Sequence, residues 1–428
     1  MSSSEDYYSR VVLGLEDDTT WSNFGGLRWQ LVLCLLGAWI IVGLCLVKGV
    51  QSSGKVVYFT ALFPYFVLFV LLIKGATLPG AAKGIEFYLQ PRLEKLSDVS
   101  VWSDAATQIF YSLGPAFGGL ITLASYNRFD NNCHRDAILI AFANCSTSVF
   151  AGFVIFSIIG FMAHESGQEV GDVIASGPGL AFVAYPEAVT KLPIAPFWSF
   201  LFFMMLITRG LDTQFTMTET LTTALMDQWP QLRPRKSQVV LTAAGLGFLL
   251  GLPMCAKGGV YMFTLIDWFS ASWSLLIMAF VEVILVQYVY GYHNFMDNIA
   301  ETGIRIPKFL TYYWRVNWQC ITPIILFGIT LVTWINFTPC SYGGYVFPPL
   351  VQLMGWLMAS TTVVIAFSMG VIEYFRREKA GKNDSIQDMF KPTAEWGPAV
   401  KATKPMAGTD LKEAAYNNDG FNYGTNKQ

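Results

Sequence analysis

The sequence predicts an all-α polytopic membrane protein. Of its 428 residues, 53% are hydrophobic and only 14% are charged, whereas a soluble domain carries roughly 25% charged residues. The hydrophobic residues form blocks of about twenty, which is the length of helix that spans a bilayer. One of these blocks is interrupted by glycine and proline, and non-helical backbone at membrane depth must be buried in protein or line a cavity.

The chain contains about nine predicted membrane spans. In chain order these spans cover residues 29–47, 56–78, 104–126, 136–163, 196–227, 237–255, 260–290, 317–336 and 347–374. Basic residues gather at one set of span ends, and the richer side is expected to be cytoplasmic. This rule predicts a cytoplasmic C-terminus, and nine spans then leave the N-terminus outside.

Several function classes do not fit the composition. The formal net charge of -2 gives no basic field for nucleic acid. The seven cysteines lack metal-ligand spacing, and the three histidines are far apart in the sequence. No nucleophile–base pair or metal-ligand cluster lies within the predicted spans, so the sequence does not predict an enzyme.

The third span, IFYSLGPAFGGLITLASY at 109–126, is the one that glycine and proline interrupt. Gly114, Gly118 and Gly119 lower helix propensity, and Pro115 also removes a backbone donor. A helix broken at mid-depth indicates an ion and substrate site in a secondary transporter. The alternative is a simple kink in a packing helix, because glycine and proline are common in membrane helices.

Polar side chains flank this break. Gln108 and Ser112 are one helical turn apart, and Asn144 and Ser148 have the same spacing in the next span. Their oxygens can coordinate Na⁺, and their hydroxyl and amide N–H groups can donate to Cl⁻. The same residue types also join membrane helices by hydrogen bonds, so both interpretations stay open.

A further polar face lies in the span LITRGLDTQFTMTETL. Arg209, Asp212 and Thr213 follow an i, i+3, i+4 pattern, and Glu219 lies seven residues beyond Asp212. A carboxylate beside a hydroxyl suits Na⁺, because the ion cancels a charge that is costly to bury. Alternatively, Arg209 forms an ion pair with Asp212 and displaces the cation.

Several long motifs resemble the neurotransmitter:sodium symporter family of Na⁺- and Cl⁻-coupled carriers. They include WSDAATQIFYSLGPAFGGLITLASYNRFDNNCHRDA, GPGLAFVAYPEAV, GLDTQF and KGGVYMFTLID, and several segments look closest to glycine transporters. The resemblance implies an inverted-repeat, leucine-transporter-like fold of twelve spans, of which the first three are missing here. Residues 1–28 would then be the remnant of an extracellular loop, 29–375 the transmembrane symporter domain, and 376–428 a flexible cytoplasmic tail.

The resemblance also implies a set of ion and substrate residues. Ser112 and Asn144 would serve the first Na⁺ site, and Asp212, Thr213 and the backbone carbonyl of Arg209 the second. The residues implied for Cl⁻ are Gln108, Ser112, Asn144 and Ser148. The residues implied for the substrate are Tyr111, Ser112, Gly114, Phe117 and Gln214.

The activity implied is Na⁺- and Cl⁻-coupled uptake of a small zwitterionic or amine substrate, with glycine the first candidate. Alternatives are proline, betaine, GABA or a monoamine, or a transport-inactive fragment that associates with full-length transporters. Two positions depart from the family pattern: Arg209 is commonly leucine, and glycine transporters carry tryptophan where this chain has Phe117. A multi-pass plasma-membrane glycoprotein in contact with lipid, and capable of forming homo-oligomers, is expected.

Overall fold

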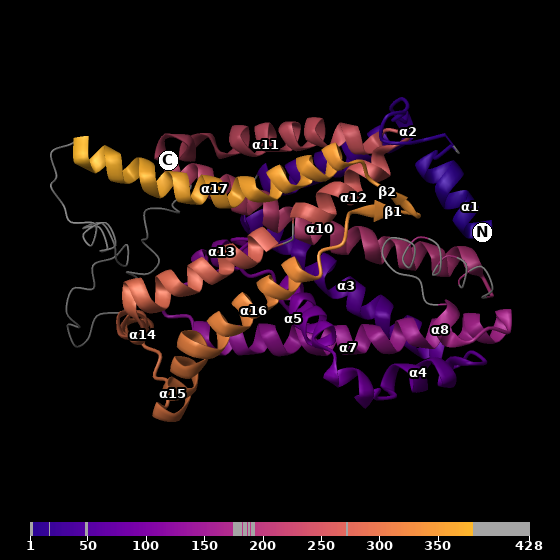
Figure 1. Ribbon diagram of the computed structural model, residues 1–428, viewed down its shortest axis with the longest axis horizontal. Coiled ribbons are helices and arrows are strands. Elements are labelled where there is room, and N and C mark those ends of the chain that lie inside the picture. The colour runs from indigo at the N-terminus through magenta and orange to yellow at the C-terminus, as the bar shows by residue number, and fades with distance from the viewer. Residues whose placement is uncertain are drawn as a thin grey trace, which may run out of the picture. The chain divides into compact units, whose positions relative to one another are not determined.

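A computed structural model describes residues 3–16, 18–47, 50–173, 182, 186, 189, 193–270 and 273–379 of the chain, and these residues are mostly helical (Figure 1). Seven helical stretches are long and apolar enough to cross a membrane, and one of them, Gly259–Glu301, runs across residues 271–272, which lie outside the described residues. The seven stretches are Trp29–Val47, Val56–Ala76, Cys133–Ser166, Pro230–Cys255, Gly259–Glu301, Lys308–Ile335 and Pro349–Arg377. The predicted polytopic and mostly helical character is therefore confirmed, although a short two-stranded antiparallel sheet within residues 341–346 departs from a strictly all-α fold.

Two of the nine predicted spans are not among the seven. The predicted span 104–126 is split into α5 (Val99–Leu113) and α6 (Gly119–Ser125), each of them too short to qualify. The predicted span 196–227 is the long helix α10 (Ala195–Gln228), which carries Arg209, Asp212 and Glu219 along its length. Both departures arise where glycine or charged residues interrupt an otherwise apolar helix.

The chain forms two compact units, one of residues 1–122, 141–271 and 337–357, the other of residues 123–140, 272–336 and 358–428. Three helices run through the boundaries between these ranges: α6, α7 (Cys133–Ser166) and α17 (Pro349–Lys379). The other elements of the first unit are α1 (Ser3–Asp6), η1 (Tyr7–Leu13), α2 (Trp29–Val47), α3 (Val50–Ala76), α4 (Ala81–Leu89), η2 (Leu93–Ser97), α5, α8 (Val170–Val173), α10, η4 (Pro230–Arg235), α11 (Lys236–Gly251), η5 (Leu252–Cys255), α12 (Gly259–Ser270), β1 (Ser341–Tyr342) and β2 (Tyr345–Val346). Those of the second unit are α13 (Trp273–Ile284), η6 (Leu285–Gly291), α14 (Tyr292–Glu301), α15 (Lys308–Val316), η7 (Asn317–Ile321) and α16 (Thr322–Ile335).

The core of the first unit forms where α3, α7 and α10 meet. Val67 and Leu71 of α3, Val154 of α7 and Phe202 of α10 belong to one buried cluster. A second cluster joins α2, α10 and α11 and contains Val42, Leu46, Phe215 and Val240. α10 contributes to both clusters, so its position is set from two sides.

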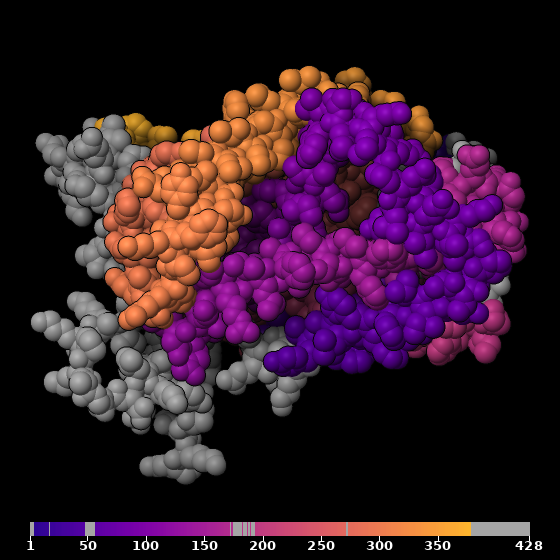
Figure 2. All heavy atoms as spheres, turned by 90° about the horizontal axis from the view of Figure 1, so that it is seen from below, coloured from indigo at the N-terminus to yellow at the C-terminus, as the bar shows by residue number. Residues whose placement is uncertain are grey.

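Glycines bring α4 and α7 into backbone contact. A Cβ atom on Gly84 would lie 1.9 Å from the carbonyl oxygen of Phe156 and 2.8 Å from the Cα of Gly160. Only glycine permits such an approach between two helices. In Figure 2 atoms coloured between purple and magenta, the colour of α7, lie at the surface, whereas residues 157–163 of this helix are buried.

The segment before α2 is attached to the turn between α11 and α12 by backbone hydrogen bonds. The Arg28 N–H donates to the Cys255 carbonyl at 2.9 Å, and the Lys257 N–H donates to the Gly26 carbonyl at 3.1 Å. Gly258 N–H likewise donates to Phe24 at 2.8 Å. These bonds align residues 24–28 with the loop that separates two predicted spans.

Two π-helical segments face each other within the second unit. η6 continues α13 and η7 precedes α16, and the Tyr288 hydroxyl of η6 donates to the Gln319 carbonyl of η7. Nearby, the Trp314 indole donates to His134 Nε2 at 2.9 Å, and the Trp314 and Trp318 rings stack with centroids 5.0 Å apart. Aromatic contacts therefore hold together the ends of three helices.

The predicted boundary between the transmembrane domain and the tail lies inside a helix. α17 continues to Lys379, four residues beyond Phe375. The predicted flexible tail otherwise lies outside the described residues, which end at 379.

Candidate functional site

The predicted helix break is present between α5 and α6. Gly114 caps α5 in the left-handed conformation, with φ 66° and ψ 40°, and helix resumes at Gly119. Within the break, Ala116 and Gly118 also have positive φ angles of 62° and 80°. Left-handed backbone costs a non-glycine residue about 1–2 kcal/mol, so the surrounding packing must hold Ala116 in place.

The glycines that end the break pack directly on α10. A Cβ atom on Gly119 would lie 3.1 Å from the Thr216 methyl, and one on Gly118 would lie 3.1 Å from the Thr220 methyl. Thr216 and Thr220 are one and two helical turns after Asp212, so they share its face of α10. The interrupted helix therefore rests on the polar face that carries Asp212.

Ser112 and Asn144 are brought together from α5 and α7. The Ser112 hydroxyl donates to Asn144 Oδ1 at 3.1 Å, and Asn144 Nδ2 donates to the same hydroxyl oxygen at 2.8 Å. Both lie in the first unit, and Ser112 is exposed on its surface. The pair has the close oxygen atoms that a Na⁺ site needs, and it also forms the helix-joining hydrogen bonds of the alternative interpretation.

The other two residues implied for Cl⁻ lie one turn from this pair. The Ser148 hydroxyl donates to the Asn144 backbone carbonyl at 3.1 Å, and both Ser148 and Gln108 are exposed. In these positions the Ser148 hydroxyl and the Gln108 amide are accessible from outside the first unit.

Asp212 does not form the ion pair with Arg209 that the spacing allowed. Its Oδ1 accepts a hydrogen bond from the hydroxyl of Thr60, a buried residue of α3. Arg209 is exposed, and the described part of the chain contains no ion pair between these two residues. The carboxylate thus contacts a neutral donor rather than a cation.

The remaining oxygens of the second implied Na⁺ site lie on the same turn of α10. The Thr213 hydroxyl donates to the Arg209 carbonyl at 3.3 Å. Asp212 and Thr213 are adjacent in the sequence, so a carboxylate, a hydroxyl and a carbonyl occur within one helical turn. A set of oxygens alone is the ligand type that hard cations favour.

The residues implied for the substrate line the break and the neighbouring helix. Tyr111 is half-buried, and its ring meets the Phe110 ring edge-on at 5.6 Å. Phe117 lies within the break, 3.7 Å from where a Gly114 Cβ atom would be. Gln214 is half-buried on α10 but lies about 200° around the helix from Asp212, so it does not face the break.

Sequence reasoning missed Thr60, Thr216 and Thr220 as neighbours of the proposed site residues. Each is a hydroxyl-bearing residue within an apolar helix, and Thr60 is only 4% exposed. The cost of polar groups at membrane depth was therefore the signal that could have found them. It would have marked each residue but not the partner that it contacts.

A sequence profile described as the sodium:neurotransmitter symporter family matches residues 1–377. The chain belongs to this family. Sodium:neurotransmitter symporters are solute transporters rather than enzymes, and the multi-pass helical architecture agrees with that membership.

Individual members of the sodium:neurotransmitter symporter family are similar over nearly the whole chain. The sodium- and chloride-dependent glycine transporter 1 of Xenopus laevis is 46% identical over 94% of this chain and 63% of its own length. Glycine transporter 2 of the same organism is 44% identical over 93% of this chain and 50% of its own length. The sodium- and chloride-dependent neutral and basic amino acid transporter B(0+) of Mus musculus is 44% identical over 97% of this chain and 65% of its own length. The chain thus spans half to two thirds of the length of these relatives.

Proposed function

We propose that the chain acts in a secondary active symporter that couples entry of Na⁺ and Cl⁻ to uptake of a small amino acid or amine, with glycine the first candidate. The observation that carries this proposal is the α5–α6 break, which rests on the Asp212 face of α10 beside the Ser112–Asn144 pair. Interrupted helices and polar groups at membrane depth form the ion and substrate sites of such carriers.

The second Na⁺ site would use Asp212, Thr213 and the Arg209 carbonyl. The carboxylate already has a hydrogen-bond donor in Thr60, and a bound cation would neutralise a charge that is costly at membrane depth. The first Na⁺ site would use Ser112 and Asn144, whose oxygens are 3.1 Å apart. Because solute and ion each complete the other's site, each would raise the other's affinity.

Chloride would be held by N–H and O–H donors of Gln108, Ser112, Asn144 and Ser148. Asn144 Nδ2 and the Ser148 hydroxyl are used here in local hydrogen bonds at 2.8 Å and 3.1 Å, and both can rotate toward an anion. The exposed positions of Gln108 and Ser148 support this assignment.

The substrate would occupy the break beside Tyr111, Ser112, Gly114 and Phe117, and Gln214, on the opposite side of α10 from the Asp212 face, is implied for the substrate by the family resemblance alone. Two of the similar proteins are named as glycine transporters and one as a transporter of neutral and basic amino acids. Phe117 is smaller than tryptophan, so a substrate larger than glycine could also fit. Proline, betaine, GABA and monoamines are the substrates to compare.

Alternating access would operate in an inverted-repeat fold, in which a bundle rocks around the broken helix. The setting would be the plasma membrane, with the C-terminus on the cytoplasmic side. The supporting observations are the seven apolar helices and the bias of basic residues toward one set of helix ends.

Replacing the carboxylate tests the role of Na⁺. In cells that express the chain, Asp212→Asn should strongly weaken the Na⁺ dependence of radiolabelled glycine uptake, because the amide cannot neutralise the ion. Asp227→Asn is the matched control, since Asp227 is exposed near the end of the same helix and pairs with Arg233. Uptake by Asp212→Asn with an unchanged Na⁺ response would refute the assignment.

A second substitution tests Cl⁻ separately. Ser148→Ala should lower the apparent Cl⁻ affinity, measured as uptake during stepwise replacement of chloride by gluconate. Ser146→Ala, an exposed serine two residues away, should leave it unchanged. Equal chloride responses in both variants would remove Ser148 from the anion site.

A second candidate function is a transport-inactive subunit that associates with other members of the family. The exposure of Gln108, Ser112 and Ser148 favours it, because polar side chains on membrane helices need a protein or aqueous neighbour. Co-purification with a full-length family member, in the absence of solute binding by the chain alone, would support this candidate over the first.

A further inference from the structure

A pocket lies where three of the membrane-spanning stretches begin or end. The stretches start at Trp29, end at Cys255 and start again at Gly259, and backbone hydrogen bonds hold residues 24–28 against residues 255–258. Since all three ends are joined at one place, the pocket belongs at a boundary between hydrocarbon and water.

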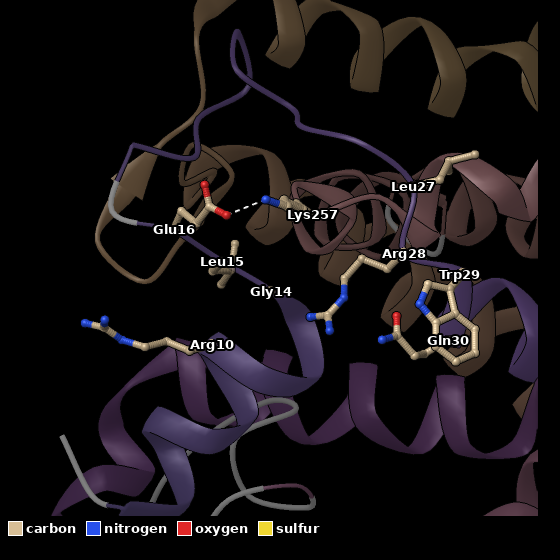
Figure 3. A pocket seen from close by; sticks show the side chains of 9 residues that line it. All are labelled: Arg10, Gly14, Leu15, Glu16, Leu27, Arg28, Trp29, Gln30 and Lys257. Atoms are coloured by element: carbon tan, nitrogen blue, oxygen red, sulfur yellow. Dashed lines mark hydrogen bonds and ion pairs between the residues drawn. The ribbon is translucent and has the colours of Figure 1, made fainter.

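The pocket has a volume of about 560 Å³ and is lined by basic, polar and apolar side chains (Figure 3). Among the described residues, its charged lining side chains are Arg10, Arg28, Lys257 and the acid Glu16. None of the residues implied for Na⁺, Cl⁻ or substrate lines it. The volume falls within the range of small-ligand sites.

Arg28 is the side chain in this pocket that has hydrogen-bond donors available for an anion. The residue is half-buried, and its guanidinium Nη1 donates to the Val12 backbone carbonyl at 3.1 Å. Within the described residues no carboxylate pairs with it. A guanidinium has five N–H donors, so donors remain for a ligand after the single bond to Val12.

The other two cations are held by exposed carboxylates. Lys257 pairs with Glu16, whose side chain is 60% exposed, and Arg10 pairs with Asp6 at 2.9 Å. Exposed ion pairs of this kind contribute about 0–1 kcal/mol. An incoming anion can therefore recruit the Lys257 ammonium at little cost.

We propose that this pocket binds a phosphate group, at Arg28 and Lys257, and that the phosphate is that of a phospholipid headgroup. The arginine fork matches phosphate oxygens bidentately, and lysine adds a point charge. Trp29, 68% exposed at the first turn of α2, supplies the aromatic side chain that is enriched at headgroup level. Leu27 is 60% exposed beside it, as acyl-chain contact requires.

The test measures ligand retention by the full chain purified in detergent. Native mass spectrometry would count bound dioleoylphosphatidylcholine, and a separate titration would measure binding of inorganic phosphate. Arg28→Gln should reduce lipid retention about tenfold, which corresponds to the loss of one charge-assisted hydrogen bond. Lys257→Gln should act in the same direction.

Two control variants sharpen the result. Arg233→Gln removes an exposed arginine from η4, outside the pocket, and should not change retention. Arg28→Lys keeps the charge but loses the fork, so its retention should lie between those of the wild type and Arg28→Gln. If Arg28→Gln does not fold, Arg28→Lys and Lys257→Gln decide the question.

The source of the phosphate is decided by Trp29→Ala. Loss of lipid retention in this variant with unchanged binding of inorganic phosphate supports the headgroup. Phosphate binding that depends on Arg28, with lipid retention unaffected by Trp29→Ala, supports free phosphate in the same site. Wild-type binding of both ligands by Arg28→Gln and Lys257→Gln would overturn the proposal.

Discussion

At the scale of single residues, the most informative contact is the one between Thr60 and Asp212. Spacing along α10 left Asp212 free to pair with Arg209 or to serve a cation, and the structure places a hydroxyl on the carboxylate instead. Thr60 and Asp212 are 152 residues apart. Periodicity relates residues of one helix, so it could not have predicted a partner on another.

Thr60→Val should destabilise the protein more in Na⁺-free buffer than in Na⁺. The substitution removes a hydrogen bond to a charged group, which contributes about 1.5–3 kcal/mol, and a bound cation would partly replace it. Thermal unfolding in choline chloride and in sodium chloride would measure the difference. Thr330→Val is the matched control, because Thr330 is a buried membrane-helix threonine that donates to the Leu326 carbonyl. An equal loss of thermal stability by Thr60→Val in both buffers would contradict a cation at Asp212.

Cys340 should resist thiol reagents through pH 9. The side chain has no exposed surface, Gln352 holds its backbone by two hydrogen bonds, and burial raises the pKa of its thiol to about 11. A raised pKa means less of the reactive thiolate at any pH below it. Maleimide labelling followed by peptide mass spectrometry should modify the exposed Cys133 first. Labelling of Cys340 at the same rate as Cys133 would show that the surroundings of Cys340 open to the reagent.

At the scale of secondary-structure elements, the break between α5 and α6 was predictable and its packing was not. Four glycine and proline residues within six positions could not continue a helix, and the structure confirms the interruption. That α6 rests on Thr216 and Thr220 follows from tertiary packing. The pairing of Ser112 with Asn144 was implied by family resemblance alone, because spacing shows only that each lies on a polar face.

Gly119→Ala should separate α6 from α10. The added methyl would lie 3.1 Å from the Thr216 methyl, and overpacking of this kind costs about 1–3 kcal/mol. Thr216→Ser removes the opposing methyl, so the double variant should recover most of the lost thermal stability. Gly210→Ala, where the added methyl meets nothing within 4 Å, should be neutral or stabilising by about 1 kcal/mol. A double variant no more stable than Gly119→Ala would contradict the contact.

Lys236→Met should strongly destabilise the junction of α10 and α11. Lys236 Nζ lies 2.6 Å from Glu219 Oε1, and the two side chains are only 12% and 4% exposed. Removing one partner of a buried ion pair leaves an uncompensated charge and costs about 3–5 kcal/mol. The double variant Glu219→Gln, Lys236→Met should recover part of this loss in a denaturation assay. No recovery would show that the carboxylate is neutralised elsewhere.

At the scale of the whole molecule, the apolar helices present most of their surface outward. In each of the seven candidate membrane-spanning stretches, no more than 31% of the most apolar 18-residue segment is buried. Soluble proteins do not expose contiguous apolar surface of this extent. Composition alone was enough to predict this property, since it depends on the residues of each helix and not on their partners. The number of spans was less predictable, because charges and glycines interrupt two of them.

The expressed chain should stay in the membrane pellet after extraction with sodium carbonate at high pH, and only detergent should release it. Exposed apolar helices transfer into lipid with a gain of about 25 cal/mol per Å², so loss of peripheral ionic contacts cannot free them. A luminal or cytosolic marker protein provides the control for complete extraction. Recovery of the chain in the carbonate supernatant would contradict the membrane assignment.

The facing segments η6 and η7 have a consequence for how this protein tolerates changes in length. A π turn contains one more residue than an α turn, and each residue advances a helix by about 100°. A single-residue deletion within 285–291 should therefore convert η6 to regular α-helix and leave the faces of α13 and α14 nearly in place, because the π turn accommodates the extra residue. Loss of one codon in η6 should therefore be tolerated, whereas the same change in the middle of α16 would rotate its apolar face by about 100°.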